Sequence, residues 1–149
     1  MKSVTGDLVE AFLRGDINVL GHQANCFNTV GAGIALQIKQ RLPEAYAADC
    51  ATLKGNPRKL GKMSYAVIGI GMVFNLYGQF KFGREKRQTD YDALRSALRM
   101  MAVKLTDHKH TAKIGLSKLG CNNAGGDWSI VSSIITDELT GFDVTIYQK

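Results

Sequence analysis

The sequence of 149 residues lacks the features that mark several large classes of protein. No apolar run approaches the roughly 18 residues of a membrane-spanning helix, and the N-terminus carries no uninterrupted apolar segment of a secretory signal. Only two prolines occur, no low-complexity tract is present, and no repeat with a period of about 20 to 50 residues is found. These absences exclude a membrane span and a repeat architecture, and we expect a cytoplasmic protein with no membrane partner.

Cysteine is also scarce. Cys26, Cys50 and Cys121 are widely spaced, and they form neither a CxxC pair nor a Cys/His pattern with metal-ligand spacing. Three reduced thiols in a cytosolic protein are the expected arrangement. We therefore expect no metal site and no cofactor.

Acidic residues are fewer than basic ones. The 13 Asp and Glu residues stand against 19 Lys and Arg residues, which gives a formal net charge of +6 and a pI near 9.3. Such a balance favours an anionic partner, which can be a nucleotide, a phosphate or a nucleic acid. Much of the excess falls in residues 53–62 and 81–87. Both stretches are typical of solvated loops, but the second directly follows a strand end, where ligand sites tend to lie.

The hydrophobic pattern predicts strands that alternate with helices along the whole chain. Strands are expected before Gly6 and in residues 17–24, 62–71, 72–79, 111–120 and 142–149, with 62–71 and 72–79 as a hairpin or adjacent strands. Helices are expected in residues 31–42, 43–54, 89–105 and 127–139, with Thr89 or Asp90 capping the third. Apolar residues make up 45%, enough for a sizeable core. The pattern predicts a single α/β domain over residues 1–149, a sandwich around a mostly parallel sheet.

Two glycine-rich turns lead from a predicted strand into a predicted helix, at residues 25–33 and 119–127. A helix N-terminus presents unpaired N–H groups and a partial positive charge, and glycine lets the backbone approach a ligand closely. "GAGIA" at 31–35 and "LGCNNAGGDW" at 119–128 each fit a phosphate site of this kind. Neither is a Walker loop or a GxGxxG dinucleotide fingerprint. Together they predict two walls around one diphosphate.

Several segments carry a resemblance to a known family. "GDL", "HQANCFNTVGAGIALQIKQRLPEAYAAD", "KLGKM", "VFNLYGQ" and "LGCNNAGGDWSIV" resemble a macro domain in order and spacing over nearly the whole chain. The chain is most similar to the branch of ADP-ribose 1''-phosphate phosphatases, the terminal ADP-ribose protein glycohydrolase and antitoxin domains that remove ADP-ribose from DNA. The resemblance implies a three-layer α/β/α sandwich with a mixed, mostly parallel sheet, and a pocket for ADP-ribose.

The resemblance also implies a role for individual residues. Asp7 would take the adenine amino group beside the Leu8 backbone, Asn25 would lie at the distal ribose, and residues 147–149 would edge the adenine. One side of the diphosphate would be held by Gly31, Ala32, Gly33 and Ile34. The other side would be closed by Leu119, Gly120, Cys121, Asn122, Asn123, Ala124 and Gly125. The polar residues of the first turn would then bind a ribose, and its glycines would contact a phosphate.

Most of these residues also have a purely structural explanation. Asp7 after Gly6 is common turn chemistry. Asn25 and Asn28 can cap the following helix or satisfy loop amides. Cys121 is placed as a nucleophile could be, but a small packed thiol is the favoured interpretation. Asp127 is best placed as the N-cap of the last helix.

The relatives that this chain resembles catalyse different reactions with different residues. The glycohydrolase and DNA-antitoxin relatives use a lysine at the position of Gln79, and the protein glycohydrolase uses an aspartate at the position of Ala124. Glutamine cannot form a Schiff base, so the lysine-adduct mechanism would need Lys81, two residues further on, to reach the site.

More of the residues expected for a phosphatase are present in this sequence. His22 begins an H-x-x-N segment, although a satisfied core histidine is its ordinary explanation, and Asn25 ends that segment. A histidine there could move a proton while Asn25 and loop N–H groups stabilise charge on ADP-ribose 1''-phosphate. His22 and Asn25 are the predicted catalytic residues. The alternatives are a non-catalytic ADP-ribose reader, a hydrolase that removes ADP-ribose from protein or nucleic acid, and nucleic-acid association through the basic stretches, whose aromatics are Phe80 and Phe82.

Overall fold

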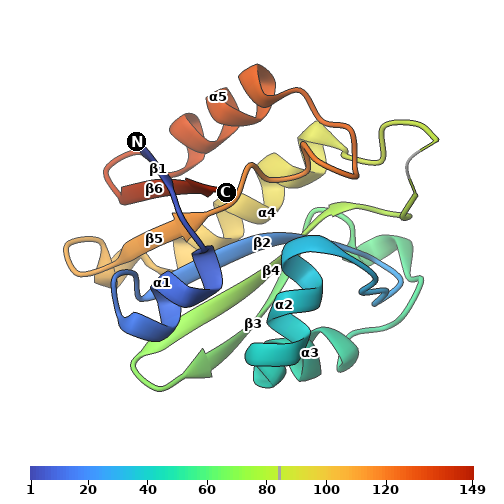
Figure 1. Cartoon of the computed structure of the whole chain (residues 1–149). Coiled ribbons are helices and arrows are strands. Elements are labelled where there is room, and N and C mark those ends of the chain that lie inside the picture. Colours follow the sequence, from blue (N-terminus) through green and yellow to red (C-terminus); the bar gives the residue numbers. More distant parts are fainter. Residues whose placement is uncertain (84) are drawn as a thin grey trace.

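The structure of the chain, a computed structural model, describes residues 1–83 and 85–149 (Figure 1). Residue 84, within the basic stretch 81–87, lies outside the described residues. The strands are β1 (Lys2–Thr5), β2 (Val19–Asn25), β3 (Met63–Ile68), β4 (Gly71–Gln79), β5 (Lys113–Leu116) and β6 (Asp143–Gln148). They form one six-stranded sheet in the order β1-β6-β5-β2-β4-β3. Among these strands only β3 and β4 pair in antiparallel fashion, so the mixed, mostly parallel sheet is confirmed.

Helices cover both faces of the sheet. Their bounds are α1 (Leu8–Arg14), α2 (Gly33–Arg41), α3 (Pro43–Cys50), α4 (Tyr91–Lys104) and α5 (Trp128–Glu138), with short 3₁₀ turns at Pro57–Lys59 and Thr106–His108. One core cluster packs α4 and α5 against the sheet, and a second packs α1, α2 and α3 against its other face. The three-layer sandwich expected from the resemblance is therefore confirmed. No helix of the described residues combines the length and apolar character that crossing a membrane requires.

Helix caps explain where the elements begin. Asp90 caps α4 by accepting the Ala93 N–H at 3.0 Å, so of the two candidates Asp90 is the cap. Asp127 caps α5, as predicted. The strand predictions for 62–71 and 72–79 correspond to an antiparallel hairpin. Helix α1 was not predicted, because Gly6 and Asp7 were interpreted as a turn.

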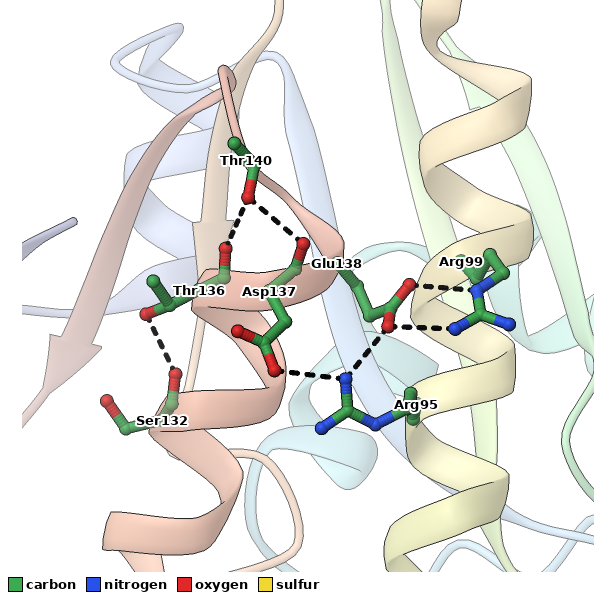
Figure 2. A network of polar contacts seen from close by, with 7 residues as sticks. All are labelled: Arg95, Arg99, Ser132, Thr136, Asp137, Glu138 and Thr140. Carbon is green, nitrogen blue, oxygen red and sulfur yellow. Dashed lines mark hydrogen bonds and ion pairs between the residues drawn. The ribbon is translucent and has the colours of Figure 1, made fainter.

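Two ion-paired arginines tie α4 to α5 (Figure 2). Arg95 Nη1 lies 2.9 Å from Glu138 Oε2 and 3.1 Å from Asp137 Oδ2, and Arg99 Nε lies 3.0 Å from Glu138 Oε1. The Arg99 guanidinium, followed by that of Arg95, lowers the pKa of Glu138. These cations are thus already matched by carboxylates of the same protein.

The parallel strands bring three connections to one end of the sheet. Strands β2, β4 and β5 run in the same direction, so the segments that follow them emerge together (Figure 1). These segments include the turn after β2, residues 80–83 and 85–90 after β4, and the turn after β5. This is the edge at which ligands bind in open α/β sheets.

Candidate functional site

A cavity of about 300 Å³ opens at the carboxyl ends of β2, β4 and β5. Its walls come from both glycine turns, from α3 and from the segment after β4. The lining residues are His22, Gln23, Ala24, Asn25, Thr29, Val30, Gly31, Ala32, Gly33, Ile34, Ala35, Asp49, Gln79, Phe82, Gly83, Ser117, Lys118, Gly120, Asn122, Asn123 and Ala124.

The first glycine turn (residues 25–33) ends in a helix N-terminus without a side-chain cap. Ala32 is the N-cap of α2, and no side chain of the described residues accepts a hydrogen bond from the first turn of that helix. Gly33 has φ of 63°, a left-handed conformation that favours glycine. Residues 31–35 all line the cavity, so the N–H groups at the start of α2 are available to an anion there.

The side chain of Asn25 is used to shape this turn. Its Oδ1 accepts hydrogen bonds from the N–H groups of Phe27 at 3.0 Å and Thr29 at 3.2 Å, and its Nδ2 donates to Thr29 O at 2.9 Å. Asn25 therefore satisfies loop amides rather than capping α2. One N–H of its amide remains for a ligand.

A buried lysine anchors the same turn from behind. Lys59 Nζ donates to Asn28 Oδ1 at 2.5 Å and to Cys26 O at 3.1 Å, and it lies 4.8 Å from the centroid of the Tyr77 ring. Burial lowers the pKa of Lys59. Asn28 has φ of 57°, which is unusual for a residue other than glycine, and the Lys59 contact holds it there. One cation of the basic stretch 53–62 is thus structural.

The second glycine turn (residues 119–127) is held by its own backbone contacts. Thr89 Oγ1 and the Gly126 N–H both donate to Gly120 O at 2.7 Å. The α5 N-terminus that follows is already occupied, because Asp127 Oδ1 accepts hydrogen bonds from the Ser129 N–H at 2.8 Å and the Ser129 hydroxyl at 2.7 Å. These bonds, the hydroxyl first, lower the pKa of Asp127. This turn offers backbone to the cavity but no free helix N-terminus.

His22 begins a chain of hydrogen bonds that runs in one direction to Asp49. Asn75 Nδ2 donates to a carbonyl of α3 and to Ser64 Oγ, both at 3.0 Å, so its Oδ1 faces His22 Nε2 at 2.5 Å. Ser64 Oγ then donates to Tyr77 Oη at 2.8 Å, and Tyr77 Oη donates to Asp49 Oδ1 at 2.7 Å. Both ends of the chain line the cavity.

This chain of hydrogen bonds fixes the tautomer of His22. Since Asn75 Oδ1 can only accept, His22 Nε2 carries the proton of a neutral ring. Burial lowers the pKa of His22, which keeps the ring neutral at physiological pH. Its Nδ1 is buried and has no hydrogen-bond partner among the residues that the structure describes. His22 Nδ1 is thus a buried acceptor that no described residue uses, so His22 is only in part the satisfied core histidine of the ordinary explanation.

The structure brings most of the predicted site residues together. Those that line the cavity are His22, Asn25, Gly31, Ala32, Gly33, Ile34, Gly120, Asn122, Asn123 and Ala124. Asp7 and Leu8 lie at the start of α1 instead, where Asp7 accepts the Glu10 N–H at 2.9 Å and pairs with Lys149 at 3.2 Å. These contacts, the Glu10 N–H first, lower the pKa of Asp7.

Three other predicted residues of the second glycine turn do not line the cavity. Leu119 is buried in the core, Gly125 packs near the backbone of Arg87, and Cys121 packs against the α4–α5 core cluster. Cys121 Sγ donates to Leu119 O at 3.3 Å, and burial raises the pKa of this thiol to about 11. The contacts and the raised pKa of Cys121 favour the packed thiol over the nucleophile.

Some cavity residues were missed from the sequence. Asp49 is the most informative, because it lies on the same helical face as the buried Leu42 and Ala45, at positions i+7 and i+4 from them. A carboxylate on an apolar helix face is a signal that could have identified it. Phe82 and Lys118 carry no comparable pattern, and only the fold brings them to the cavity.

Comparisons with known proteins agree with this architecture. An uncharacterised 17.5 kDa protein of Enterobacteria phage T4 is 28% identical over 151 residues, covering 98% of this chain and 94% of that protein. A DNA ADP-ribosyl glycohydrolase of Mycobacterium tuberculosis is 29% identical over 148 residues, but the chain spans only 40% of its length. The macrodomain of Mycobacterium tuberculosis DarG superimposes with a TM-score of 0.73 at 25% identity, covering 99% of this chain and 97% of that one.

A family model covers most of the site. The model described as "Macro domain" matches residues 22–135, a span that runs from His22 through both glycine turns into α5. This span exceeds half of the chain. The chain therefore belongs to the macro domain family.

Proposed function

We propose that this chain binds ADP-ribose in the cavity and hydrolyses ADP-ribose 1''-phosphate to ADP-ribose and inorganic phosphate. The observation that carries the binding proposal is the uncapped N-terminus of α2, which faces the cavity beside Gly33. A diphosphate there would accept hydrogen bonds from N–H groups that have no other partner and would gain from the helix dipole. The second glycine turn would cover the diphosphate from the opposite side.

The cavity also supplies a group that can move a proton. A water molecule that attacks the phosphorus must lose a proton, and the O1''–P bond that breaks leaves an oxygen on the ribose that must gain one. Neutral His22 can accept the first proton at Nδ1 and return it to the leaving oxygen. The remaining amide N–H of Asn25 and loop N–H groups would stabilise the charge that develops.

The lysine-adduct mechanism receives less support. Gln79 and Ala124 both line the cavity, so the positions of the relatives' lysine and aspartate are filled by side chains that cannot perform those roles. Lys81 is exposed and does not line the cavity. The residues present favour direct hydrolysis of a phosphate ester over attack on C1'' by a lysine amine.

The test is a phosphate-release assay on ADP-ribose 1''-phosphate, with ADP-ribose binding measured by calorimetry on the same preparation. His22→Ala should lower the release rate by about 10²- to 10⁴-fold, the range that a general acid–base group contributes, while ADP-ribose still binds. The exposed His110→Ala is the matched control and should keep the wild-type rate. Full turnover by His22→Ala would remove histidine from the mechanism.

A second candidate is removal of ADP-ribose from DNA. It is favoured by the similarity to the mycobacterial DNA ADP-ribosyl glycohydrolase. Release of ADP-ribose from a modified oligonucleotide, without phosphate release from ADP-ribose 1''-phosphate, would replace the first proposal with this one. Binding of ADP-ribose with neither reaction would make the chain a reader.

A further inference from the structure

Three phenylalanines join the two basic stretches at the mouth of the cavity. The Phe27 ring lies edge-on to Phe80, with centroids 5.0 Å apart, and edge-on to Phe82 at 6.5 Å. Gly55, in the stretch 53–62, packs against the Phe27 ring and donates its N–H to Cys26 O at 2.7 Å. Two loops that are distant in sequence are therefore packed through one aromatic cluster.

Phe82 is the member of this cluster that reaches solvent. It is 56% exposed and also lines the cavity. An apolar ring held by a neighbouring ring, and still open on a large part of its surface, can serve as a stacking surface. Its position beside the cavity means that whatever stacks on it lies next to the ligand in the cavity.

The loop segments that pack into this aromatic cluster or line the cavity are predominantly basic. Residues 51–62, 79–89 and 117–126 hold nine of the chain's 19 Lys and Arg residues but only one of its 13 Asp and Glu residues. The described basic residues of these segments are exposed except for the buried Lys59; they are Lys54, Arg58, Lys62, Lys81, Lys86, Arg87 and Lys118.

These exposed cations have no acidic partners among the described residues. No ion pair joins any of the seven to another described residue, whereas Arg95 and Arg99 are matched by carboxylates on α5 (Figure 2). Lys118 and Arg87 lie over aromatic rings, 5.4 Å from the centroid of Trp128 and 4.4 Å from that of Tyr91. These loops, which we call the rim, thus form an unneutralised basic surface with aromatic rings among its cations, and Lys118 and Phe82 connect this surface to the cavity that they line.

We infer that this rim binds single-stranded nucleic acid, with an unpaired base stacked on Phe82 and backbone phosphates on the surrounding lysines and arginines. Stacking on an exposed ring requires a base that is free of its duplex, and a basic groove with aromatic rings is the usual arrangement for single strands. An acidic peptide would use the cations but not the ring. The further step, that the strand carries the ADP-ribose held in the cavity, rests on the proposed ADP-ribose binding and on the second candidate function, removal of ADP-ribose from DNA.

Fluorescence anisotropy of the full chain with a labelled single-stranded oligonucleotide tests this inference. Phe82→Ala should weaken binding by about 5- to 100-fold, the range for loss of one base stack, and Phe82→Leu should not restore it. The triple variant Lys81→Gln, Lys86→Gln, Arg87→Gln should weaken binding and reduce its dependence on salt, with a log–log slope smaller by about 2. The corresponding duplex should bind more weakly than the single strand.

A charge-matched control lies at the other end of the sheet. Lys2→Gln, Lys109→Gln and Lys113→Gln remove three exposed lysines far from the carboxyl ends of the strands and should leave oligonucleotide binding unchanged. Equal losses in both triple variants, wild-type binding by Phe82→Ala, or equal competition by polyglutamate would overturn the inference. Calorimetry with ADP-ribose separates the two proposals, because oligonucleotide binding without ADP-ribose binding refutes only the proposed function.

Discussion

The first and second glycine turns both lead from a strand into a helix, but they leave different groups free. In the first, α2 begins at Gly33 after the N-cap Ala32, which supplies no side-chain acceptor, and the residues of its first turn line the cavity. In the second, the Asp127 carboxylate fills the same position at the start of α5. The first turn is also anchored by the buried Lys59, whereas the second is anchored through Thr89 and its own backbone.

This difference shows that glycine content alone does not identify a phosphate site. A glycine-rich turn permits close approach of a ligand, but the helix after it attracts an anion only where no carboxylate already occupies its N-terminus. The two walls predicted from the sequence are therefore unequal. The first would supply the charge that holds a diphosphate, and the second would supply its cover.

The largest effect on ADP-ribose affinity is expected from giving the first turn the kind of helix cap that the second turn already has. Ala32→Asp would place a carboxylate at the start of α2, where it accepts the N–H groups of the first helical turn and repels a diphosphate. We expect ADP-ribose affinity to fall at least about tenfold in calorimetry, while the free energy of unfolding rises by about 0.5–2 kcal/mol. Ala32→Ser caps without charge and should lose less affinity. Wild-type affinity in Ala32→Asp would place the diphosphate elsewhere.

The next effect concerns the anchor of the first turn. Lys59→Met removes the charged hydrogen bonds to Cys26 O and Asn28 Oδ1 and leaves these acceptors with only the Gly55 N–H and the more distant Thr52 hydroxyl. We expect a loss of about 1–3 kcal/mol in urea unfolding and a fall of several-fold in ADP-ribose affinity, because the turn no longer holds its shape. The exposed Lys62→Met in the same stretch is the control and should match the wild type. An unchanged Lys59→Met would show that the turn is shaped without this lysine.

A smaller effect on binding is expected from removing the cap of the second turn. Asp127→Ala should lower the Tm at neutral pH by a few degrees and leave ADP-ribose affinity within about twofold. Because the folded pKa of Asp127 is lowered, its stabilisation is full above the ordinary value of 3.8 and is lost as the pH falls through the folded value. The Tm difference between the two proteins should therefore shrink in strong acid. A difference that stays constant down to the lowest pH would mean that the carboxylate charge does not contribute.

The smallest effect is expected at Cys121. Its raised pKa keeps the thiol protonated at neutral pH, and its side chain packs away from the cavity. Cys121→Ala should keep phosphate release within about twofold, and iodoacetamide should modify the thiol slowly until the pH approaches 11. A loss of tenfold or more in Cys121→Ala, with ADP-ribose binding intact, would restore the nucleophile interpretation.

Much of the fold follows from the sequence because its elements are long or strongly bounded. The α4 stripe, the Asp127 cap and the strand runs are local signals, and each corresponds to an observed element. Helix α1 was missed because it has only seven residues, and its apolar pattern is too short to show a helical period. Asp7 and Glu10 do stand at capping-box spacing, and the Glu10 N–H bonds Asp7 in the structure, so a signal was present.

The site is less predictable because it depends on contacts between distant segments. The two glycine turns could be found locally, but the tautomer of His22 depends on Asn75, and Asp49 reaches the cavity only through the packing of α3. Lys59 stands among exposed basic residues in the sequence, and nothing local distinguishes it from them. Roles of this kind are set by the tertiary structure.

The order of strands in the sheet has a consequence for synthesis of the protein on the ribosome. Among the described strands, β1 pairs with β6 alone, through registers such as Lys2 with Thr145 and Thr5 with Gln148, and β6 lies between β1 and β5. During synthesis β1 therefore has no partner in the sheet until β6 has been made, and the six-stranded sheet is complete only after residue 148 has emerged. Deletion of residues 143–149 would remove β6 and leave β1 without a partner, so two strands of the sheet would be lost together although they lie far apart in the sequence.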